Sequence, residues 1–592
     1  MSHNAFNKVL VANRGEIAVR IFRTLRELGL GSVAVYSEAD RGALHVGYAD
    51  ESFLIGPPPA AESYLKIETL LETAQRAGAQ AVHPGYGFLA ENATFARAVE
   101  EAGLVWIGPP PSAIELMGSK TRARQAMQAA GVPIIPGTTD PVGSVEELLR
   151  VGETIGYPLL IKAAAGGGGK GMEVVEAPRD AERAFETARR QGQSYFADPN
   201  VYVEKLIVDP RHVEVQVLAD AHGNVIHLGE RDCTIQRRHQ KLVEETPSPA
   251  VDAELRARIG AIGVDAARAC GYRSAGTIEG LLTADGEYFF MEMNTRIQVE
   301  HTVTELVAGL DLVREQILIA QGEPLSLTQE QVQLRGHAIE CRINAEDVAR
   351  GFLPTPGVVT AYREPSGPGV RVDSGVAAGN EVSGVYDPMI AKLIVHGVDR
   401  EHARRRMLRA LGEFHIEGPK TLIGFHKALL SHDCFIRGET CHGLVESEEL
   451  AAQAAALETT QLEATSLPSN TLLQGKTVER VRVVEVDGRR FEVRIADPEP
   501  PWRELARRRH ERERAASGAG GDAVVSPMQG TVLSVAVAEG DIVESGQVIC
   551  IVEAMKMENE VRAHRAGTVT ALLVETGQPV ATGEVICSII GE

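Results

Sequence analysis

The chain lacks the features of several protein classes. Its seven cysteines are odd in number and form no Cys-x-x-Cys pair, which favours reduced thiols over a disulfide framework or a zinc site. No apolar run approaches the ~18 residues of a membrane span, and residues 1–8 contain no apolar signal-peptide core. Acidic residues outnumber basic ones by 81 to 60, and the net charge of −21 would repel nucleic acid. We therefore expect a cytoplasmic protein with no membrane or nucleic-acid partner.

The N-terminal region predicts an open α/β sheet. At 592 residues the chain is long enough for three to five domains. Residues 8–12 predict a buried strand, residues 17–28 a helix and residues 32–37 a second strand. The glycines do not follow the Gly-x-Gly-x-x-Gly pattern, so we predict no dinucleotide site. A Gly/aromatic loop at 82–92, taken alone, favours a structural role over a catalytic one.

One short sequence occurs twice near the C-terminus. Residues 530–550 recur in part at 567–587, with an offset of 37 residues at each matching position. A fixed offset indicates two equivalent units, here Val/Ile-rich strands between glycine turns, and so a small β-sandwich with internal two-fold symmetry. The link between the copies is then a tight turn with Lys556 at its tip, flanked by two methionines. Most exposed lysines are only solvated charges, but this placement marks Lys556 as a functional candidate.

A glycine-rich loop indicates phosphate binding in the middle of the chain. Residues 158–162 predict a buried strand that ends in a lysine and runs into the glycine-rich stretch 163–171. Such a loop lets backbone N–H groups approach phosphate oxygens, while Lys162 and Lys170 supply charge. It is not a Walker P-loop, and a flexible connecting loop is the alternative. The strand predicted at 201–207 is of the kind that lies over an adenine ring.

Two carboxylates further along predict a metal site. Glu279 and Glu292 lie on apolar, strand-like stretches, and Asn294 follows the second. A buried carboxylate is costly unless it is paired or binds a metal. Two carboxylates and an amide oxygen are hard ligands suited to a Mg²⁺ ion that also holds nucleotide phosphates, with Mn²⁺ as an alternative.

The order of these motifs resembles that of the ATP-grasp ligases, and four strings narrow the resemblance to biotin carboxylase. The strings lie at residues 212–216, 231–241, 292–301 and 340–346. The Ala-Met-Lys-Met turn resembles the biotinyl domain of biotin-dependent carboxylases, in which this lysine carries biotin; the related lipoyl domains usually lack the two methionines. Together the chain resembles the fused α subunit of an acyl-CoA carboxylase, similar to actinobacterial acetyl- and propionyl-CoA carboxylases.

The resemblance implies a multidomain α/β fold followed by an all-β biotinyl barrel-sandwich domain. The expected domains are a pre-ATP-grasp, Rossmann-like N-terminal domain at 1–118, an ATP-grasp domain at 119–328, a biotin carboxylase C-terminal domain at 329–445, a connector at 446–522 and the biotinyl carrier at 523–592.

The connector contains four different stretches. Residues 446–476 predict a partly ordered segment, and alternation over 478–495 around Asp487-Gly488 predicts a hairpin. The family places a carboxyltransferase-docking domain here, although the stretch is short for one. Residues 502–514 hold six arginines and three glutamates, as in a solvated helix or a partner patch, and residues 515–521 predict a flexible linker.

The resemblance also assigns roles to charged residues. Bicarbonate is a poor electrophile, so ATP must activate it as carboxyphosphate, and planar anions favour guanidinium forks. Glu300 is the implied base that deprotonates bicarbonate, and Arg342 the implied charge beside the developing negative oxygen of biotin. Further implied contacts to bicarbonate and biotin are Lys241, Arg296, Gln298 and the Val299 N–H. Implied ATP contacts are Lys120, Lys162, Gly167, Gly168, Gly169, Lys170, Gly171, Met172, Glu204, Lys205, Leu206, His212, Gln236 and His239.

The implied cofactors are biotin bound covalently to Lys556, ATP and Mg²⁺, with bicarbonate as substrate. The implied partners are a carboxyltransferase β subunit, a biotin protein ligase and further copies of this chain in a large α/β complex. No remaining stretch is long enough for a carboxyltransferase, so we expect acyl-CoA specificity on another polypeptide. Two alternatives are a carrier subunit with an inactive ATP-grasp half and a ligase for another acid with a lipoylated tail. The intact charged residues disfavour the first, and the Met-Lys-Met turn and Glu300 disfavour the second.

Overall fold

The structure of the chain is a computed structural model, and its parts fall into two compact units. One unit comprises residues 1–383 with 388–455, and the other residues 384–387 with 456–592. No helix within the described ranges is long and apolar enough to cross a bilayer. The residues described are 6–163, 172–196, 198–464, 477–486, 489–498, 522–554 and 557–591.

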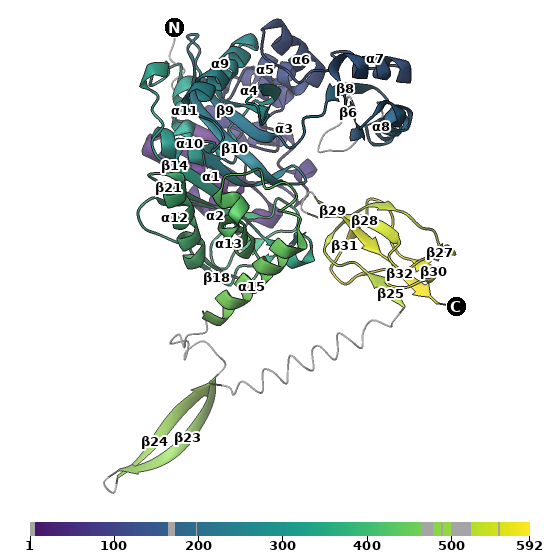
Figure 1. Ribbon diagram of the computed structural model, residues 1–592. Helices are drawn as coiled ribbons and strands as arrows, with labels where there is room; N and C mark the ends of the chain where they lie inside the picture. The colour runs from purple at the N-terminus through teal and green to yellow at the C-terminus, as the bar shows by residue number, and fades with distance from the viewer. Residues whose placement is uncertain are drawn as a thin grey trace. The chain divides into compact units, whose positions relative to one another are not determined.

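The first unit (Figure 1) begins with a five-stranded parallel sheet. Its strand order is β3-β2-β1-β4-β5. The predicted βαβ start is confirmed, because β1 and β2 pair in parallel and α1 connects them. Helix α3 ends at Gly78, whose φ of +64° is the left-handed conformation that glycine adopts without strain. The elements are β1 (Lys8–Val11), α1 (Gly15–Glu27), β2 (Gly31–Ser37), α2 (Leu44–Tyr48), β3 (Glu51–Gly56), α3 (Ile67–Ala77), β4 (Ala81–His83), α4 (Ala93–Glu101), β5 (Val105–Trp106) and α5 (Pro111–Gly118).

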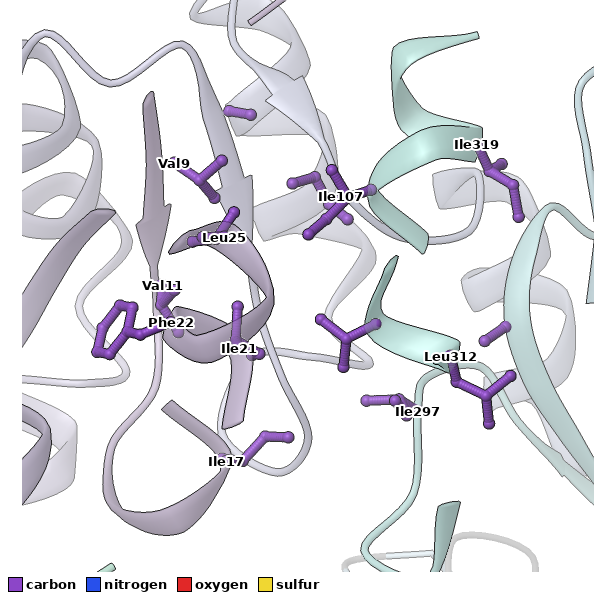
Figure 2. Packing of buried hydrophobic residues seen from close by; sticks show 14 of the residues in the cluster. Val9, Val11, Ile17, Ile21, Phe22, Leu25, Ile107, Ile297, Leu312 and Ile319 are labelled. Carbon is purple, nitrogen blue, oxygen red and sulfur yellow. The ribbon is translucent and has the colours of Figure 1, made fainter. Parts of the chain in front are cut away.

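One apolar cluster joins this sheet to segments almost 300 residues later. Ile297 is completely buried in the cluster and lies between two expected site residues, Arg296 and Gln298. Burying such a side chain contributes roughly 1.5–3 kcal/mol, so the cluster anchors the loop that carries these polar groups. Members shown in Figure 2 include Val9, Val11, Ile17, Ile21, Phe22, Leu25, Ile107, Ile297, Leu312 and Ile319.

A smaller lobe carries the glycine-rich loop between β6 and β7. Its three-stranded antiparallel sheet has the order β7-β6-β8, and the predicted strands at 158–162 and 201–207 are confirmed. The expected ATP contacts Gly167, Gly168, Gly169, Lys170 and Gly171 lie outside the described residues. The elements are α6 (Lys120–Ala129), α7 (Val145–Ile155), β6 (Leu159–Ala163), β7 (Met172–Val175), α8 (Ala181–Phe196) and β8 (Val201–Lys205).

An eight-stranded sheet in the order β13-β12-β9-β10-β11-β14-β21-β19 forms the centre of the unit. Because β11 pairs with β14, one continuous sheet crosses the expected boundary between residues 328 and 329. Its strands are β9 (Arg211–Ala219), β10 (Val225–Arg237), β11 (Gln240–Thr246), β12 (Ser274–Leu282), β13 (Tyr288–Asn294), β14 (His337–Asn344), β19 (Val370–Ser374) and β21 (Met389–Gly397). The helices of this region are α9 (Ala253–Ala269), α10 (His301–Ala308), α11 (Leu312–Gln321), α12 (Arg400–Glu413), α13 (Ile423–Ser431), α14 (Asp433–Ile436) and α15 (Glu448–Ala464).

The expectation that all seven cysteines are thiols is wrong for two of them. Cys434 and Cys441 form a disulfide, whereas the five others are free and buried. The chain turns back after α14 through Gly438, at a φ of +69°, and this brings the two Cα atoms to 5.7 Å. The seven-residue spacing between Cys434 and Cys441 does not by itself indicate in the sequence that the chain reverses between them.

The connector is partly helical and contains the predicted hairpin. Helix α15 covers much of 446–476, and β23 (Thr477–Val486) pairs with β24 (Arg489–Pro498) in antiparallel register. Val486 opposes Arg489, so Asp487-Gly488 is the two-residue link. The arginine-rich stretch 502–514 and the predicted linker 515–521 lie outside the described residues.

The C-terminal region is the predicted β-sandwich. Its two sheets have the orders β25-β32-β30-β27 and β29-β28-β26-β31. Each repeat gives one short strand to the other repeat's sheet: Val543 pairs with Gly567, and Gly530 with Val580, as two-fold symmetry requires. The strands are β25 (Ala523–Val525), β26 (Gly530–Val535), β27 (Ile542–Val543), β28 (Val548–Ala554), β29 (Met557–Arg562), β30 (Gly567–Leu572), β31 (Pro579–Val580) and β32 (Val585–Ile590).

Candidate active site

A buried cation, Lys241 at the start of β11, lies at the centre of the site. Its Nζ is 2.5 Å from Glu214 Oε2, 2.8 Å from Glu279 Oε1 and 2.6 Å from Glu300 Oε1. Burial alone would lower the pKa of Lys241, but the three carboxylates outweigh burial and raise it. Lys241 therefore remains charged, and strands β9 and β12 with the turn before α10 supply the three carboxylates around it.

Glu300 lies between two cations. In addition to Lys241, Arg342 on β14 places Nη2 3.0 Å from Glu300 Oε2. Burial would raise the pKa of Glu300, but the charges of Lys241, Arg342 and Arg231 hold it below its usual value. The carboxyl is thus ionised before any substrate binds, which is the state that a proton acceptor needs.

A fully buried arginine, Arg231 on β10, holds several of these polar groups in place. Arg231 Nε is 2.5 Å from Glu214 Oε1, and its Nη2 donates to Gln298 Oε1 at 2.7 Å. Gln298 Nε2 in turn donates to Glu279 Oε1 at 2.6 Å. The sequence strings contained Glu214 and Arg231, but their roles were missed, because only pairing across strands reveals them. Gln298, expected to hold bicarbonate, is engaged on both sides by protein.

The loop at 82–92, interpreted as structural, reaches the site through Glu91. Glu91 Oε2 accepts from Arg296 Nε at 2.9 Å, and Oε1 accepts from the Thr295 backbone N–H at 2.9 Å. Arg296 Nη2 also donates to Asn294 Oδ1 at 2.8 Å. The loop that follows β4 in the first sheet therefore binds one of the two expected guanidinium groups. The sequence does not reveal this contact, because its two residues lie about two hundred positions apart.

The carbonyl and the N–H of Val299 differ in their hydrogen bonding. Its carbonyl accepts from the buried Lys392 Nζ at 2.9 Å, and that lysine lies 3.3 Å from Glu16. Among the described residues none accepts a hydrogen bond from the Val299 N–H. The role of this N–H as a donor to bicarbonate stays a prediction.

The expected metal ligands lie on adjacent strands. Glu279 on β12 directly opposes Glu292 on β13, and Asn294 ends the same strand. Glu279 is buried as expected, whereas Glu292 is exposed on its strand. Partial desolvation and then the charge of Glu279 raise the pKa of Glu292. His212 Nε2 lies 3.0 Å from Glu279 Oε2, and ligand atoms of His212, Glu214 and Glu279 lie within 4.8 Å of one another. Two facing carboxylates and an amide oxygen fit a hard divalent cation.

Most of the expected nucleotide contacts within the described residues lie in the small lobe and on β9 and β10. Lys162 Nζ is 2.5 Å from Glu204 Oε2, and Lys205 Nζ donates to the Tyr157 carbonyl at 2.7 Å. The Leu206 N–H donates to the Pro158 carbonyl at 3.0 Å. These contacts add to the pairing of β8 with β6, the strand that leads into the glycine-rich loop. Met172 begins β7.

Gln236 and His212 hydrogen-bond each other, with Gln236 Nε2 2.9 Å from His212 Nδ1. Gln236 also lines a cavity of about 290 Å³ together with Arg238 and His442. Lys120 lies at the start of α6, and its charge opposes the rise in the pKa of Glu292 that desolvation and Glu279 cause. His239 is exposed in the turn between β10 and β11 and contacts none of these groups within the described residues.

Lys556 lies outside the described residues; the flanking Ala554 and Met557 are paired, so the link between β28 and β29 is two residues long.

Together, the parallel N-terminal sheet, the small three-stranded lobe, the carboxylate–cation site on the eight-stranded sheet and the C-terminal β-sandwich define an ATP-grasp carboxylase module and a carrier domain. Family models match all four parts: the biotin carboxylase N-terminal domain (residues 5–114), the carbamoyl-phosphate synthase L chain ATP-binding domain (119–328), the biotin carboxylase C-terminal domain (340–447) and the biotin-requiring enzyme domain (522–589). The chain belongs to the biotin carboxylase family.

The proteins that this chain resembles are carboxylases named for different acceptor substrates. The chain is 55% identical over 434 residues to a pyruvate carboxylase subunit of Methanothermobacter thermautotrophicus, covering 73% of this chain and 88% of the relative. It is 45% identical over 574 residues to the biotin-dependent acyl-coenzyme A carboxylase alpha3 subunit of Mycobacterium leprae, covering 94% of each chain. The biotin carboxylase domain dimer of Hydrogenobacter thermophilus 2-oxoglutarate carboxylase, solved with MgADP and bicarbonate, has a TM-score of 0.71 and 46% identity over 75% of this chain and 98% of that one.

The expected fold class is confirmed by these matches. The chain is a biotin carboxylase with a biotin-requiring domain, and its reaction is the ATP-dependent carboxylation of biotin. Biotin, ATP, Mg²⁺ and bicarbonate are the corresponding cofactors and substrates.

Proposed function

We propose that the chain is the α subunit of an acyl-CoA carboxylase, in which biotin on Lys556 receives a carboxyl group and delivers it to an acyl-CoA on a separate β subunit. The observation that carries this proposal is the extent of similarity. The Mycobacterium leprae alpha3 subunit matches 94% of this chain, across both the carboxylase and carrier regions, whereas the archaeal pyruvate carboxylase subunit matches 73%. We infer an acetyl- or propionyl-CoA carboxylase of actinobacterial type, acting in fatty acid and lipid metabolism.

The site residues then have distinct tasks. Glu300 accepts the proton of bicarbonate, and Lys241 and Arg296 hold the charge of the anion with the Val299 N–H as donor. Arg342 holds positive charge beside the ureido oxygen of biotin, where negative charge develops. When bound, biotin would supply the ring nitrogen that takes up the carboxyl group as its N–H proton passes to phosphate. Glu279, Glu292 and Asn294 would hold a Mg²⁺ ion that offsets charge on the phosphates of ATP.

Nucleotide binding is the task of the small lobe. We assign Lys120, Lys162 and the glycine-rich loop to the phosphates, and Glu204 to Leu206 to the adenine. The pairing of β8 with β6 supports this assignment, because it places the adenine strand beside the strand that leads into the loop. His212 and Gln236, which hydrogen-bond each other at 2.9 Å, are assigned to the ribose side.

The carrier turn supports biotin attachment at Lys556. Strand β28 ends at Ala554 and β29 begins at Met557, so Lys556 belongs to the two-residue link between these paired strands. We assign this lysine as the residue that biotin protein ligase modifies. The hairpin β23–β24 is the proposed contact with the β subunit, because its register leaves both strands without another sheet neighbour among the described residues.

The test is substrate use with and without the partner. The purified chain should hydrolyse ATP when bicarbonate and free biotin are present, yet carboxylate no acyl-CoA until the carboxyltransferase subunit is added. Acetyl-CoA, propionyl-CoA, longer acyl-CoAs and pyruvate are then compared as acceptors. Carboxylation of pyruvate in preference to every acyl-CoA would overturn the proposal, as would acyl-CoA carboxylation by this chain in the rigorous absence of a partner.

A further inference from the structure

A second carboxylate, Glu244 on β11, binds the same guanidinium as Glu300. Arg342 Nε donates to Glu244 Oε1 at 2.6 Å, and Arg342 Nη2 lies 2.5 Å from the same oxygen. The Nη2 group also reaches Glu300 Oε2 at 3.0 Å. Arg342 is thus shared by two carboxylates, and within the described residues no contact uses its Nη1.

Within the described part of the chain, the Glu244 carboxyl has no partner other than Arg342. The side chain is completely buried, and its Oε2 accepts no hydrogen bond from any described residue. Burial raises the pKa of Glu244 to about 8, even though the charge of Arg342 opposes this rise. The neighbouring charges of Glu340, which directly opposes Glu244 on β14, and of Glu300 add to the rise. Arg342 is the one described group that offsets the cost of burying this carboxyl, so the position of each side chain depends on the other.

We propose that Glu244 is a positioning residue for biotin carboxylation, which ties the Nε edge of Arg342 and leaves Nη1 for the reacting groups. This inference rests on the role proposed above for Arg342. Without Glu244, the guanidinium has Glu300 as its one remaining carboxylate contact and is free to rotate toward it. The full positive charge would then act on Glu300, lower its pKa further and weaken it as a base. The rotated guanidinium and the weaker base both slow the chemical step, and neither changes the nucleotide contacts of the small lobe.

The next residue provides a matched control. Glu245 is also buried on β11, but successive side chains of a strand point to opposite faces. Its Oε2 accepts from Arg400 Nε at 2.7 Å and lies 2.7 Å from His337 Nε2. Glu245→Gln therefore removes a buried, arginine-paired carboxylate one position away without touching Arg342.

The experiment measures carboxylation of free biotin by the full chain carrying Glu244→Ala, Glu244→Gln or Glu245→Gln. We expect kcat to fall about tenfold or more for Glu244→Ala and about threefold or more for Glu244→Gln, which keeps a neutral acceptor for Nε. The KM for ATP should change less than about twofold in both, and Glu245→Gln should retain kcat. If Glu244→Ala does not fold, the isosteric Glu244→Gln decides.

A double-mutant cycle separates positioning from general damage. In an Arg342→Ala background, adding Glu244→Ala should lower kcat no further, because the group that it positions is already absent. Equal losses in both backgrounds, or unchanged kcat in both single Glu244 variants, would overturn the inference. A normal rate for Arg342→Ala itself would instead refute the proposed role of Arg342, so the two failures are distinguishable.

Discussion

Replacing Glu300 by glutamine tests the central assignment, the base that deprotonates bicarbonate. The change removes one of the three carboxylates around Lys241 and one of the two at Arg342. Lys241 keeps Glu214 at 2.5 Å and Glu279 at 2.8 Å, and Arg342 keeps Glu244. Neither cation is left without a partner, so the variant should fold.

The expected loss in rate follows from the task. A positioned base contributes roughly 10²–10⁴-fold to a proton transfer, so kcat for biotin carboxylation should fall at least about a hundredfold, or ~2.7 kcal/mol in the barrier. The amide cannot accept the proton at any accessible pH, so raising the pH should not restore the rate. ATP binding should persist, because the described contacts of Lys162, Glu204 and Lys205 in the small lobe include neither Glu300 nor its partners Lys241 and Arg342.

The assay follows ADP release and carboxylation of free biotin while ATP is titrated. Glu305→Gln is the control: Glu305 is buried and is bound by Arg20 at 2.8 Å and Arg371 at 2.7 Å. That variant should lose thermal stability and keep its turnover. Turnover of Glu300→Gln within about threefold of the unaltered chain would refute the base role.

Four further outcomes are expected. Intact mass and avidin blotting of Lys556→Arg should show no biotin with the fold retained; biotin persisting on it would move the attachment site. The denatured, unreduced chain should titrate five thiols, and seven after reduction, because Cys434 and Cys441 are paired; seven without reductant would disprove the pairing. Burial would raise the pKa of Glu245, but hydrogen bonds from His337 and Arg400 lower it to about 2. The ionised carboxylate therefore stabilises the fold above pH ~4.5, and this stabilisation is lost as the pH falls toward 2. The melting-temperature deficit of Glu245→Gln should therefore shrink below pH ~4.5, and a constant deficit would contradict this. Deleting residues 478–497 should weaken binding to the β subunit in sedimentation while carboxylation of free biotin persists; unchanged binding would exclude the hairpin as the contact.

The sequence by itself determined the features that arise from neighbouring residues. The 37-residue offset predicted a two-fold β-sandwich, because a repeated pattern of apolar strands and glycine turns folds the same way twice. Asp487-Gly488 predicted the hairpin, since this pair favours the backbone of a two-residue turn. Glu279 and Glu292 on apolar, strand-like stretches predicted a Mg²⁺ site together with Asn294, and the structure places the two carboxylates opposite each other on adjacent strands.

Only the tertiary structure decided which charges meet. Glu91, Glu214, Arg231 and Glu244 contact site residues, yet none has a local pattern that sets it apart from an ordinary surface charge. Their partners depend on the order of the strands: β14 lies beside β11 although about a hundred residues separate them, and this adjacency gives Arg342 its second carboxylate. The Cys434–Cys441 disulfide likewise depends on a chain reversal at Gly438. Strand order and chain reversal result from burying the whole apolar core, so a short window of sequence does not contain them.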